Sequence, residues 1–355
     1  MSGPLLLRCT ALTCYTPMIL GFGVSAMKRR EFITLLSGGA VATWPIAARA
    51  QQAGMPLVGV MSPLSLATAA RNLAALRNGL RDLGYIEGRN IKIESRFAEG
   101  MAERFPALVS DLVALKPAAI LVGSTSAILA ARKVTRTIPL IWFGSVDDPV
   151  ALGLVESFAR PGGNVTGFLL SSDARMVSKR LELLLDAAPG FSRVGVLLAP
   201  DYATADGTMK SITPAAHGLG IDVRVYEVRS ETELQAAFAV AVRDGVQALY
   251  VSEAPHLLTH RAEIAAQVAS VRLPAMYSFR EYVQSGGLMS YGADLPDLYR
   301  RAAAYVDKIL KGGHPGELPL QSAEKFELVV NLKTAKALGL TISEAFLLRA
   351  DEVIE

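Results

Sequence analysis

The chain alternates short apolar runs with longer amphipathic segments, and it does so twice. The short runs begin near Val58, Ile91, Ile120 and Leu140 in the first half, and near Val194, Val223, Leu249 and Ala275 in the second. The segments between them carry apolar residues three and four positions apart, as in helices that pack on a sheet. Apolar strands joined by helices are typical of parallel sheets. We therefore expect an α/β protein with two doubly wound parallel-sheet lobes.

Two glycine-rich turns predict where the chain passes between these lobes. The sequence RPGGN at positions 160–164 precedes the β-like residues 165–170, and SGG at 285–287 precedes a similar run at 288–291. Ordinary turns between a helix and a strand have the same composition. Because both turns follow a four-strand unit, we interpret the two extended runs as hinge strands that join the lobes.

The hinge interpretation sets the domain boundaries. Lobe 1 is expected to comprise residues 56–166 and about 288–322, and lobe 2 residues 167–287. Residues 323–355 include a strand-like run at 325–331, but the pattern does not show to which lobe they belong.

Residues 27–50 have the pattern of a secretory leader. Lys28, Arg29 and Arg30 precede a short apolar run, and Ala48-Arg49-Ala50 forms a small-x-small cleavage pattern. A membrane anchor is the alternative, but glycines and a proline interrupt the run, which is shorter than the roughly 20 residues of a spanning helix. We expect a cleaved twin-arginine signal peptide and a periplasmic protein.

Residues 1–26 lack a charged start, so we expect Met27 to be the true start and residues 1–26 to be a gene-model extension.

Composition after the leader excludes several classes of function. Removing the five basic residues and one acidic residue of positions 1–50 from the 36 basic and 33 acidic residues leaves 31 and 32, a net charge of −1. The chain therefore lacks the basic surface of nucleic-acid-binding proteins. Cys9 and Cys14, the two cysteines, precede residue 50, so no disulfide or thiolate metal site is expected in the mature protein.

The sequence has no recognisable catalytic or cofactor motif. Neither a phosphate-binding G-x-x-x-x-G-K-[ST] nor a G-x-S-x-G nucleophile turn occurs, and no G-x-G-x-x-G follows a strand of the mature chain. His256 and His260, with Glu253 one turn earlier, have metal-site spacing, but Pro255 indicates that the helix starts after Glu253, so we expect two surface histidines. Asp148-Pro149 is interpreted as a helix start. We expect no enzymatic activity, cofactor or metal; an exported hydrolase is the alternative.

Ligands of open α/β sheets bind beyond the carboxyl ends of the strands. The candidate binding residues at these positions are Ser62, Ser124, Thr125, Gly144 and Ser145 in the first half, and Tyr202, Glu253 and Tyr277 in the second.

Each group of candidates suits a different part of a small solute. Hydroxyls beside free N–H groups at a helix start suit a carboxylate. Glu253 or Asp201 is expected to hold an ammonium group, and Tyr202 and Tyr277 to cover an apolar portion. Alternatively, a hydroxyl among residues 124–126 only caps the following helix. Three consecutive hydroxyls exceed the need of one cap, so we expect at least one to face the cleft.

Several segments together resemble one protein family. They are the leader KRREFITLLSGGA, ARPGGNVTG at 159–167, GGLMSYG at 286–292 and KFELVVNLKTAKALGLTI at 325–342. In these segments the chain resembles the ABC-transporter substrate-binding proteins of the tryptophan/tyrosine-binding type.

The resemblance implies a type I periplasmic binding protein, monomeric and without enzymatic activity. Such a protein binds a small molecule between two hinged lobes and passes it to an ABC permease that a separate ATPase powers. Characterised relatives bind aromatic amino acids, which makes an amino acid or a related carboxylate the expected solute. A sensory binding protein that presents its ligand to a membrane receptor is the alternative.

Overall fold

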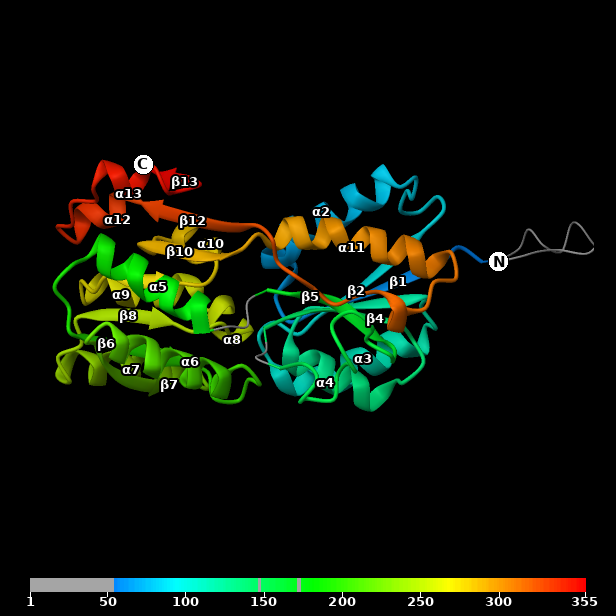
Figure 1. Cartoon of the computed structure of the whole chain (residues 1–355), viewed down its shortest axis with the longest axis horizontal. Coiled ribbons are helices and arrows are strands. Elements are labelled where there is room, and N and C mark those ends of the chain that lie inside the picture. The colour runs from blue at the N-terminus through cyan, green and yellow to red at the C-terminus, as the bar shows by residue number, and fades with distance from the viewer. Residues whose placement is uncertain (1–53, 146–147, 171–173) are drawn as a thin grey trace, which may run out of the picture. The chain divides into compact units, whose positions relative to one another are not determined.

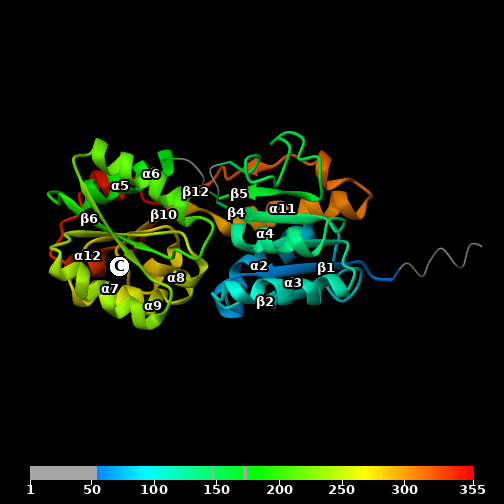
Figure 2. The same ribbon diagram turned by 90° about the horizontal axis from the view of Figure 1, so that it is seen from below.

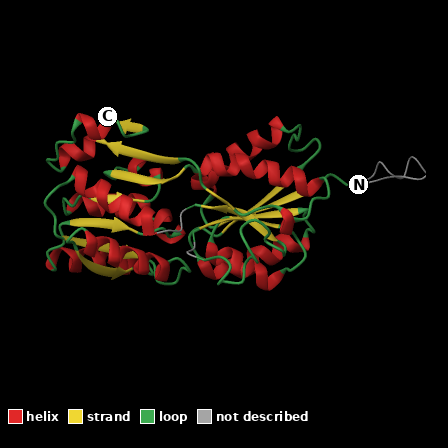
Figure 3. Cartoon of the chain, viewed as in Figure 1, coloured by secondary structure: helices red, strands yellow, loops and turns green. Residues whose placement is uncertain are grey.

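The computed structural model describes residues 54–145, 148–170 and 174–355 of the chain. The predicted signal peptide and the 26 residues before it lie outside the described residues. Residues 55–355 form one unit of tertiary contacts that contains two sheets, each flanked by helices (Figures 1 and 3). We call each sheet with its helices a lobe.

Lobe 1 has a six-stranded parallel sheet in the order β11-β5-β4-β3-β1-β2. Its strands are β1 (Leu57–Ser62), β2 (Lys92–Phe97), β3 (Ala119–Val122), β4 (Leu140–Gly144), β5 (Val165–Leu169) and β11 (Gln321–Ser322). Its helices are α2 (Leu66–Asp82), η2 (Ala102–Arg104), α3 (Phe105–Ala114), α4 (Thr125–Val134), α11 (Leu295–Leu310) and η3 (Pro315–Glu317). Helices α2 and α11 cover one face of the sheet, and α3 and α4 cover the other (Figure 1).

Lobe 2 has a seven-stranded sheet in the order β13-β12-β10-β9-β8-β6-β7, in which β10 and β12 are antiparallel. Its strands are β6 (Arg193–Leu198), β7 (Asp222–Glu227), β8 (Ala248–Val251), β9 (Ala275–Tyr277), β10 (Met289–Ala293), β12 (Phe326–Asn331) and β13 (Glu352–Ile354). Its helices are α5 (Ala174–Ala187), α6 (Ala205–Gly218), α7 (Glu231–Arg243), α8 (Pro255–Thr259), α9 (Arg261–Ser270), α10 (Arg280–Gln284), α12 (Leu332–Ala337) and α13 (Glu344–Leu347). Helices α5 and α6 lie on one face and α7 and α9 on the other (Figure 2).

The predicted pattern of strands and helices matches these elements closely. The apolar central strands β1, β3 and β4 are almost entirely buried, because helices cover both faces of the sheet. Ser65 caps α2 by accepting a hydrogen bond from the Thr68 N–H, and Leu73, Leu76 and Leu80 form its buried face. The fold class expected from the sequence, two doubly wound α/β lobes, is therefore confirmed.

Close packing of α2 against α11 fixes one wall of the later site. A Cβ atom on Gly79 of α2 would lie 2.6 Å from the Arg300 carbonyl oxygen of α11. Glycine therefore allows the two helix backbones to approach, although α11 begins more than 200 positions after α2 ends.

The two runs interpreted as hinge strands instead pair within the sheets, except for Leu170 and Leu288, which lie just outside the strands. Residues 165–169 pair with β4 along their whole length, from Leu140↔Val165 to Gly144↔Leu169. Residues 289–293 pair with β9 and β12, so they lie in lobe 2 and not in lobe 1 as expected. Both runs are apolar and almost fully buried, and a sheet position satisfies their backbone groups while burying their side chains.

The chain passes between the sheets directly after each of these two strands and at one further place. One passage follows β5, the second joins β10 to α11, and the third joins β11 to β12. The final segment, for which the sequence left the lobe open, supplies β12 and β13 to lobe 2.

Candidate ligand-binding site

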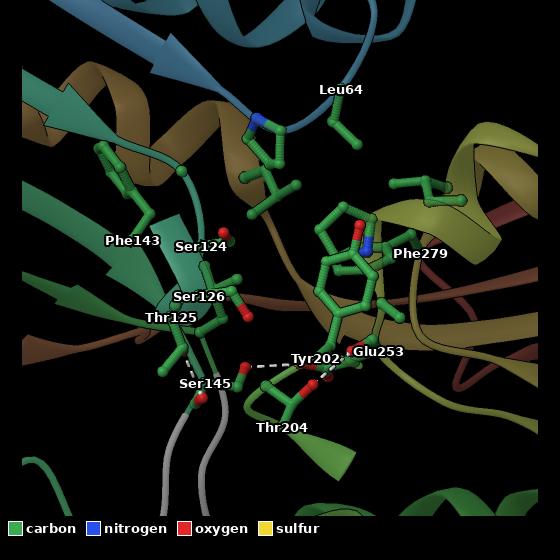
Figure 4. Close-up of a pocket in the computed structure, with 18 of the residues that line it drawn as sticks. Leu64, Ser124, Thr125, Ser126, Phe143, Ser145, Tyr202, Thr204, Glu253 and Phe279 are labelled. Carbon is green, nitrogen blue, oxygen red and sulfur yellow. Dashed lines mark hydrogen bonds between the residues drawn. The ribbon is translucent and has the colours of Figure 1, made fainter. Parts of the chain in front are cut away.

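A cavity lies between the lobes, beyond the carboxyl ends of β1, β3, β4 and β8 (Figure 4). The space it encloses, including the part open to solvent, is about 660 Å³. Hydroxyl side chains at the start of α4 form one wall, and aromatic and aliphatic side chains from both lobes form much of the rest. Lining residues of lobe 1, such as Ser124 and Phe143, lie across the cavity from lining residues of lobe 2, such as Tyr202 and Phe279 (Figure 4).

The start of α4 supplies three hydroxyls, each with a different role. Ser124 is the helix cap and accepts a hydrogen bond of 3.1 Å from the Ala127 N–H. The Thr125 hydroxyl donates to the Ser145 carbonyl oxygen at 2.7 Å, and Ser126 Oγ accepts from the Ala203 N–H of lobe 2 at 3.1 Å. Ser124 therefore caps the helix, as the alternative interpretation expected, whereas Thr125 and Ser126 bind the backbone of neighbouring loops.

The backbone at this helix start is suited to an anion. Thr125 and Ser126 are the first two residues of α4, and their N–H groups have no acceptor within the helix. These groups carry the positive end of the helix dipole. A carboxylate beside them would accept hydrogen bonds without the need for a cationic side chain.

Four aromatic rings line the cavity. Phe143, at the end of β4, stacks on Tyr299 of α11 with ring centroids 4.3 Å apart and planes 4° apart. Tyr202 and Phe279 come from lobe 2. The Tyr202 hydroxyl donates to the Gly100 carbonyl oxygen of lobe 1, and burial, as the main cause, raises the pKa of Tyr202. The rings therefore offer an apolar surface for an aromatic or aliphatic group.

Glu253 enters the cavity from lobe 2 and is already paired. Its carboxylate accepts a hydrogen bond from the Ser145 hydroxyl of lobe 1 at 2.6 Å and one from Arg180 Nη2 at 2.6 Å. Arg180 also donates to the Tyr291 carbonyl oxygen at 2.6 Å and to the Tyr250 hydroxyl at 3.1 Å. Burial disfavours its charged form, but Tyr250 and Glu253 outweigh that effect and raise the pKa of Arg180.

The pair makes this side of the cavity electrically neutral. The Arg180 side chain is 3% exposed and that of Glu253 is 12% exposed, so water screens the two charges weakly. Glu253 is the one charged side chain among the described residues that line the cavity. Its charge is balanced by Arg180, a partner that the sequence did not predict for Glu253.

Six of the eight candidate residues line the cavity, namely Ser124, Thr125, Gly144, Ser145, Tyr202 and Glu253. Ser62 is buried and accepts a hydrogen bond from the Leu64 N–H at 3.2 Å, so it shapes the loop after β1. Tyr277 is fully buried in lobe 2 and stacks on Tyr282 at 4.6 Å. It lies in the core because its ring is turned under α10, and Phe279 lines the cavity instead.

Asp201, the other acid considered for an ammonium group, lies outside this cavity. Its side chain is 65% exposed and lies 3.8 Å from Arg229 Nε.

Asp148 accepts hydrogen bonds from the Val150 and Ala151 N–H groups, but residues 149–153 form turns and no helix. The predicted helix start is therefore wrong, and the carboxylate holds a turn in place of a helix.

Sequence reasoning missed Asn72, Arg180 and Tyr299. Asn72 and Tyr299 lie within α2 and α11, and Arg180 lies within α5, so none of them directly follows a strand in the sequence. No motif marks these positions, because their roles depend on which elements pack together.

The structure contains no group of three histidine, cysteine, aspartate or glutamate side chains that could hold a metal within its described residues. His256 and His260 contact each other edge-on at 4.8 Å, and burial lowers the pKa of His256. In the same ranges of the chain, no helix is long and apolar enough to span a bilayer.

Comparison with known proteins agrees with this arrangement. The family model described as ABC transporter substrate binding protein matches residues 57–354. The chain belongs to this family. Its members are binding proteins for small solutes, and they typically act outside the cytoplasm. The family expected from the sequence is confirmed.

Individual relatives share both sequence and fold. A tyrosine-binding protein of Clostridioides difficile (strain R20291) is 30% identical over 262 residues, which cover 74% of each chain. A conserved domain protein from Vibrio cholerae has a TM-score of 0.78 at 27% identity, and an ABC domain in complex with L-Trp from Streptococcus pneumonia has 0.77 at 25%. Each match covers 84% of this chain and 99% of the other. The fold is that of type I periplasmic binding proteins.

Proposed function

We propose that this protein is the solute-binding component of an ABC uptake transporter and that it binds an amino acid with an aromatic side chain between its lobes. The observation that carries the proposal is the cavity itself, whose lining combines four aromatic rings with the start of α4. The relatives named above for tyrosine and solved with L-Trp support the same class of solute.

The solute's carboxylate is expected at the start of α4. There the Thr125 and Ser126 N–H groups can donate to it, while Ser124 and Thr125 keep the helix start and the Ser145 loop in place. The aromatic group then lies against Phe143 and the other rings.

The charge of the lining favours a solute without net charge. Because Arg180 balances Glu253, an anionic or cationic solute would bring an unpaired charge into a weakly hydrated cavity, which is costly. An amino acid with a neutral side chain has one carboxylate and one ammonium group. The carboxylate is expected at α4, and the ammonium group beside the Glu253 carboxylate oxygens.

Contacts between the lobes are expected to close over the bound solute. Ser145 donates to Glu253, and Ser126 accepts from Ala203, so residues at the cavity wall also join the two lobes. Closure about hinge segments is a general mechanism of periplasmic binding proteins. Removing either contact is expected to speed release of the solute.

The transport partner and the location follow from the same proposal. The monomeric protein would deliver its solute to an ABC permease in the inner membrane, which a separate ATPase powers. Export would use the twin-arginine leader at residues 27–50.

Replacing both Arg29 and Arg30 by lysine is expected to leave the unprocessed chain in the cytoplasm, as cell fractionation would show. Processing of the doubly substituted chain at the wild-type level would contradict export by this route.

Binding is tested by calorimetry and thermal unfolding with L-tyrosine, L-tryptophan and L-phenylalanine. A solute at 100 times its dissociation constant is expected to add about 2.7 kcal/mol to the free energy of unfolding. Replacing both Ser124 and Thr125 by alanine is expected to weaken binding by about tenfold. Ser230→Ala is the matched control, because Ser230 caps α7 through the Glu233 N–H and does not line the cavity.

The proposal fails if none of the three amino acids binds. It also fails if the double variant, folded as circular dichroism shows, binds as tightly as the control. If the double variant and Ser230→Ala lose the same affinity, the loss comes from a missing helix cap and not from a contact with the solute.

A further inference from the structure

Asn72 is a polar side chain in a mostly apolar part of the cavity wall. It lies on the buried face of α2, lines the cavity and is 3% exposed. Pro63 and Leu64 line the cavity from the loop that leads into α2, and Leu295 and Tyr299 line it from α11. The wall formed by these two helices therefore presents mostly apolar atoms, together with the Asn72 carboxamide and the Tyr299 hydroxyl.

The Asn72 carboxamide is incompletely hydrogen-bonded. Its Oδ1 atom is buried and has no hydrogen-bond partner within the described part of the chain. A buried acceptor without a donor is unfavourable, whereas most buried polar side chains in proteins have a partner. A solute that supplies a donor at this point would remove the deficit.

The position of Asn72 identifies which end of the solute it meets. Helices α2 and α11 cover one face of the lobe 1 sheet and α4 covers the opposite face (Figure 1). The cavity is lined from both faces, by Asn72 on one side and by the start of α4 on the other. A solute with its carboxylate at α4 therefore extends its side chain toward Asn72.

We infer that Asn72 determines specificity, because its Oδ1 atom accepts a hydrogen bond from a donor at the end of the solute remote from the carboxylate. This inference rests on the proposed function, which sets the direction of the solute. A phenolic hydroxyl suits the position best, since it donates to the carboxamide oxygen and accepts from the carboxamide N–H in either orientation of the side chain. The preferred solute is therefore an aromatic amino acid whose ring carries a hydroxyl.

Discrimination between solutes follows from the unpaired acceptor. A site that hydrogen-bonds a hydroxyl of its solute rejects the analogue without it, because the polar group of the site then stays buried and unpaired. L-Tyrosine and L-phenylalanine differ by this hydroxyl alone. We expect the wild-type protein to bind L-tyrosine at least about tenfold more tightly.

The test compares the two amino acids on three proteins by calorimetry. Asn72→Leu, which keeps the branched shape and removes the acceptor, is expected to reduce the tyrosine-to-phenylalanine affinity ratio to about two or less. Asn78→Leu is the matched control, because Asn78 lies on the exposed side of the same helix, where it accepts a hydrogen bond from Arg81. It is expected to keep the wild-type ratio.

Thermal unfolding without solute separates recognition from a structural role. Asn72→Leu is expected to melt at or above the wild-type temperature, because leucine replaces a buried group that has no partner. A clearly lower melting temperature would overturn the inference, since it would show that the carboxamide stabilises the fold.

The binding results separate this inference from the function on which it rests. An equal affinity ratio in the wild type and Asn72→Leu overturns the role of Asn72 and leaves the proposed function standing. Wild-type protein that binds neither amino acid overturns both.

Discussion

Replacing Arg180 with methionine is expected to destabilise the protein more than any exposed substitution of the same kind. Arg180 is 3% exposed at its side chain and donates to Glu253, to the Tyr250 hydroxyl and to the Tyr291 carbonyl oxygen. Methionine fills much of the same space but leaves the Glu253 carboxylate buried without its cation. Removing one partner of a buried ion pair costs about 3–5 kcal/mol.

The magnitude in this protein is expected near the lower end of that range. Glu253 keeps 12% exposure and its hydrogen bond from Ser145, so part of the charge stays solvated after Arg180 is removed. We therefore expect a loss of about 3 kcal/mol in the free energy of unfolding. Adding Glu253→Gln removes the unpaired charge, so the double variant is expected to recover at least about 1 kcal/mol.

Urea unfolding followed by tryptophan fluorescence measures these differences. Trp142 is the single tryptophan after residue 50, and its complete burial in β4 makes it sensitive to unfolding. Arg104→Met is the control, because its 2.7 Å pair with Glu99 is 42% and 53% exposed and is expected to contribute about 0–1 kcal/mol. A loss in Arg180→Met no larger than in Arg104→Met, or a double variant less stable than Arg180→Met, would refute the reasoning.

Three further predictions test other parts of the site. Gly144→Ala is expected to lower stability by about 1–3 kcal/mol and to abolish binding, because its Cβ would lie 2.3 Å from Trp142 Nε1; unchanged calorimetry would contradict the packing argument. Tyr277→Phe is expected to leave the affinity for L-tyrosine within about twofold, since the Tyr277 hydroxyl is buried away from the cavity; a larger loss would return Tyr277 to the site. Burial raises the pKa of Glu281, so its contribution to stability is greatest below its unfolded pKa and is lost as the pH rises through the folded value. Glu281→Gln is thus expected to raise the urea midpoint more at pH 7 than at pH 4, and the reverse order would contradict this sign.

The positions of the strand ends could be predicted from the sequence, and with them most of the site. A parallel sheet brings the carboxyl ends of its strands to one edge, so Ser124, Thr125, Gly144 and Ser145 were expected together from local pattern alone. The structure places all four in the cavity wall. Glu253 was also located correctly, but its pairing with Arg180 was not expected.

The side chains that complete the site could not be predicted in this way. Hydrophobic periodicity shows which face of a helix is buried and leaves open which element it meets. Tyr299 reaches the cavity because α11 returns to lobe 1 and packs on α2, and Arg180 meets Glu253 across 73 positions of sequence. The same uncertainty led to the wrong interpretation of residues 165–170 and 288–291 as hinges, since an extended apolar run fits a sheet and a crossing equally well.

The sequence by itself determined the two-lobed α/β fold and the edge of the sheets where the cavity lies, because these depend on period, turns and strand ends, and its motif segments indicated the family. Tertiary structure alone decided that Glu253 is neutralised by Arg180, that Tyr277 is core, and that Asn72 is part of the cavity lining. Burial and pairing depend on contacts between residues far apart in the chain. A local pattern carries no information about those contacts.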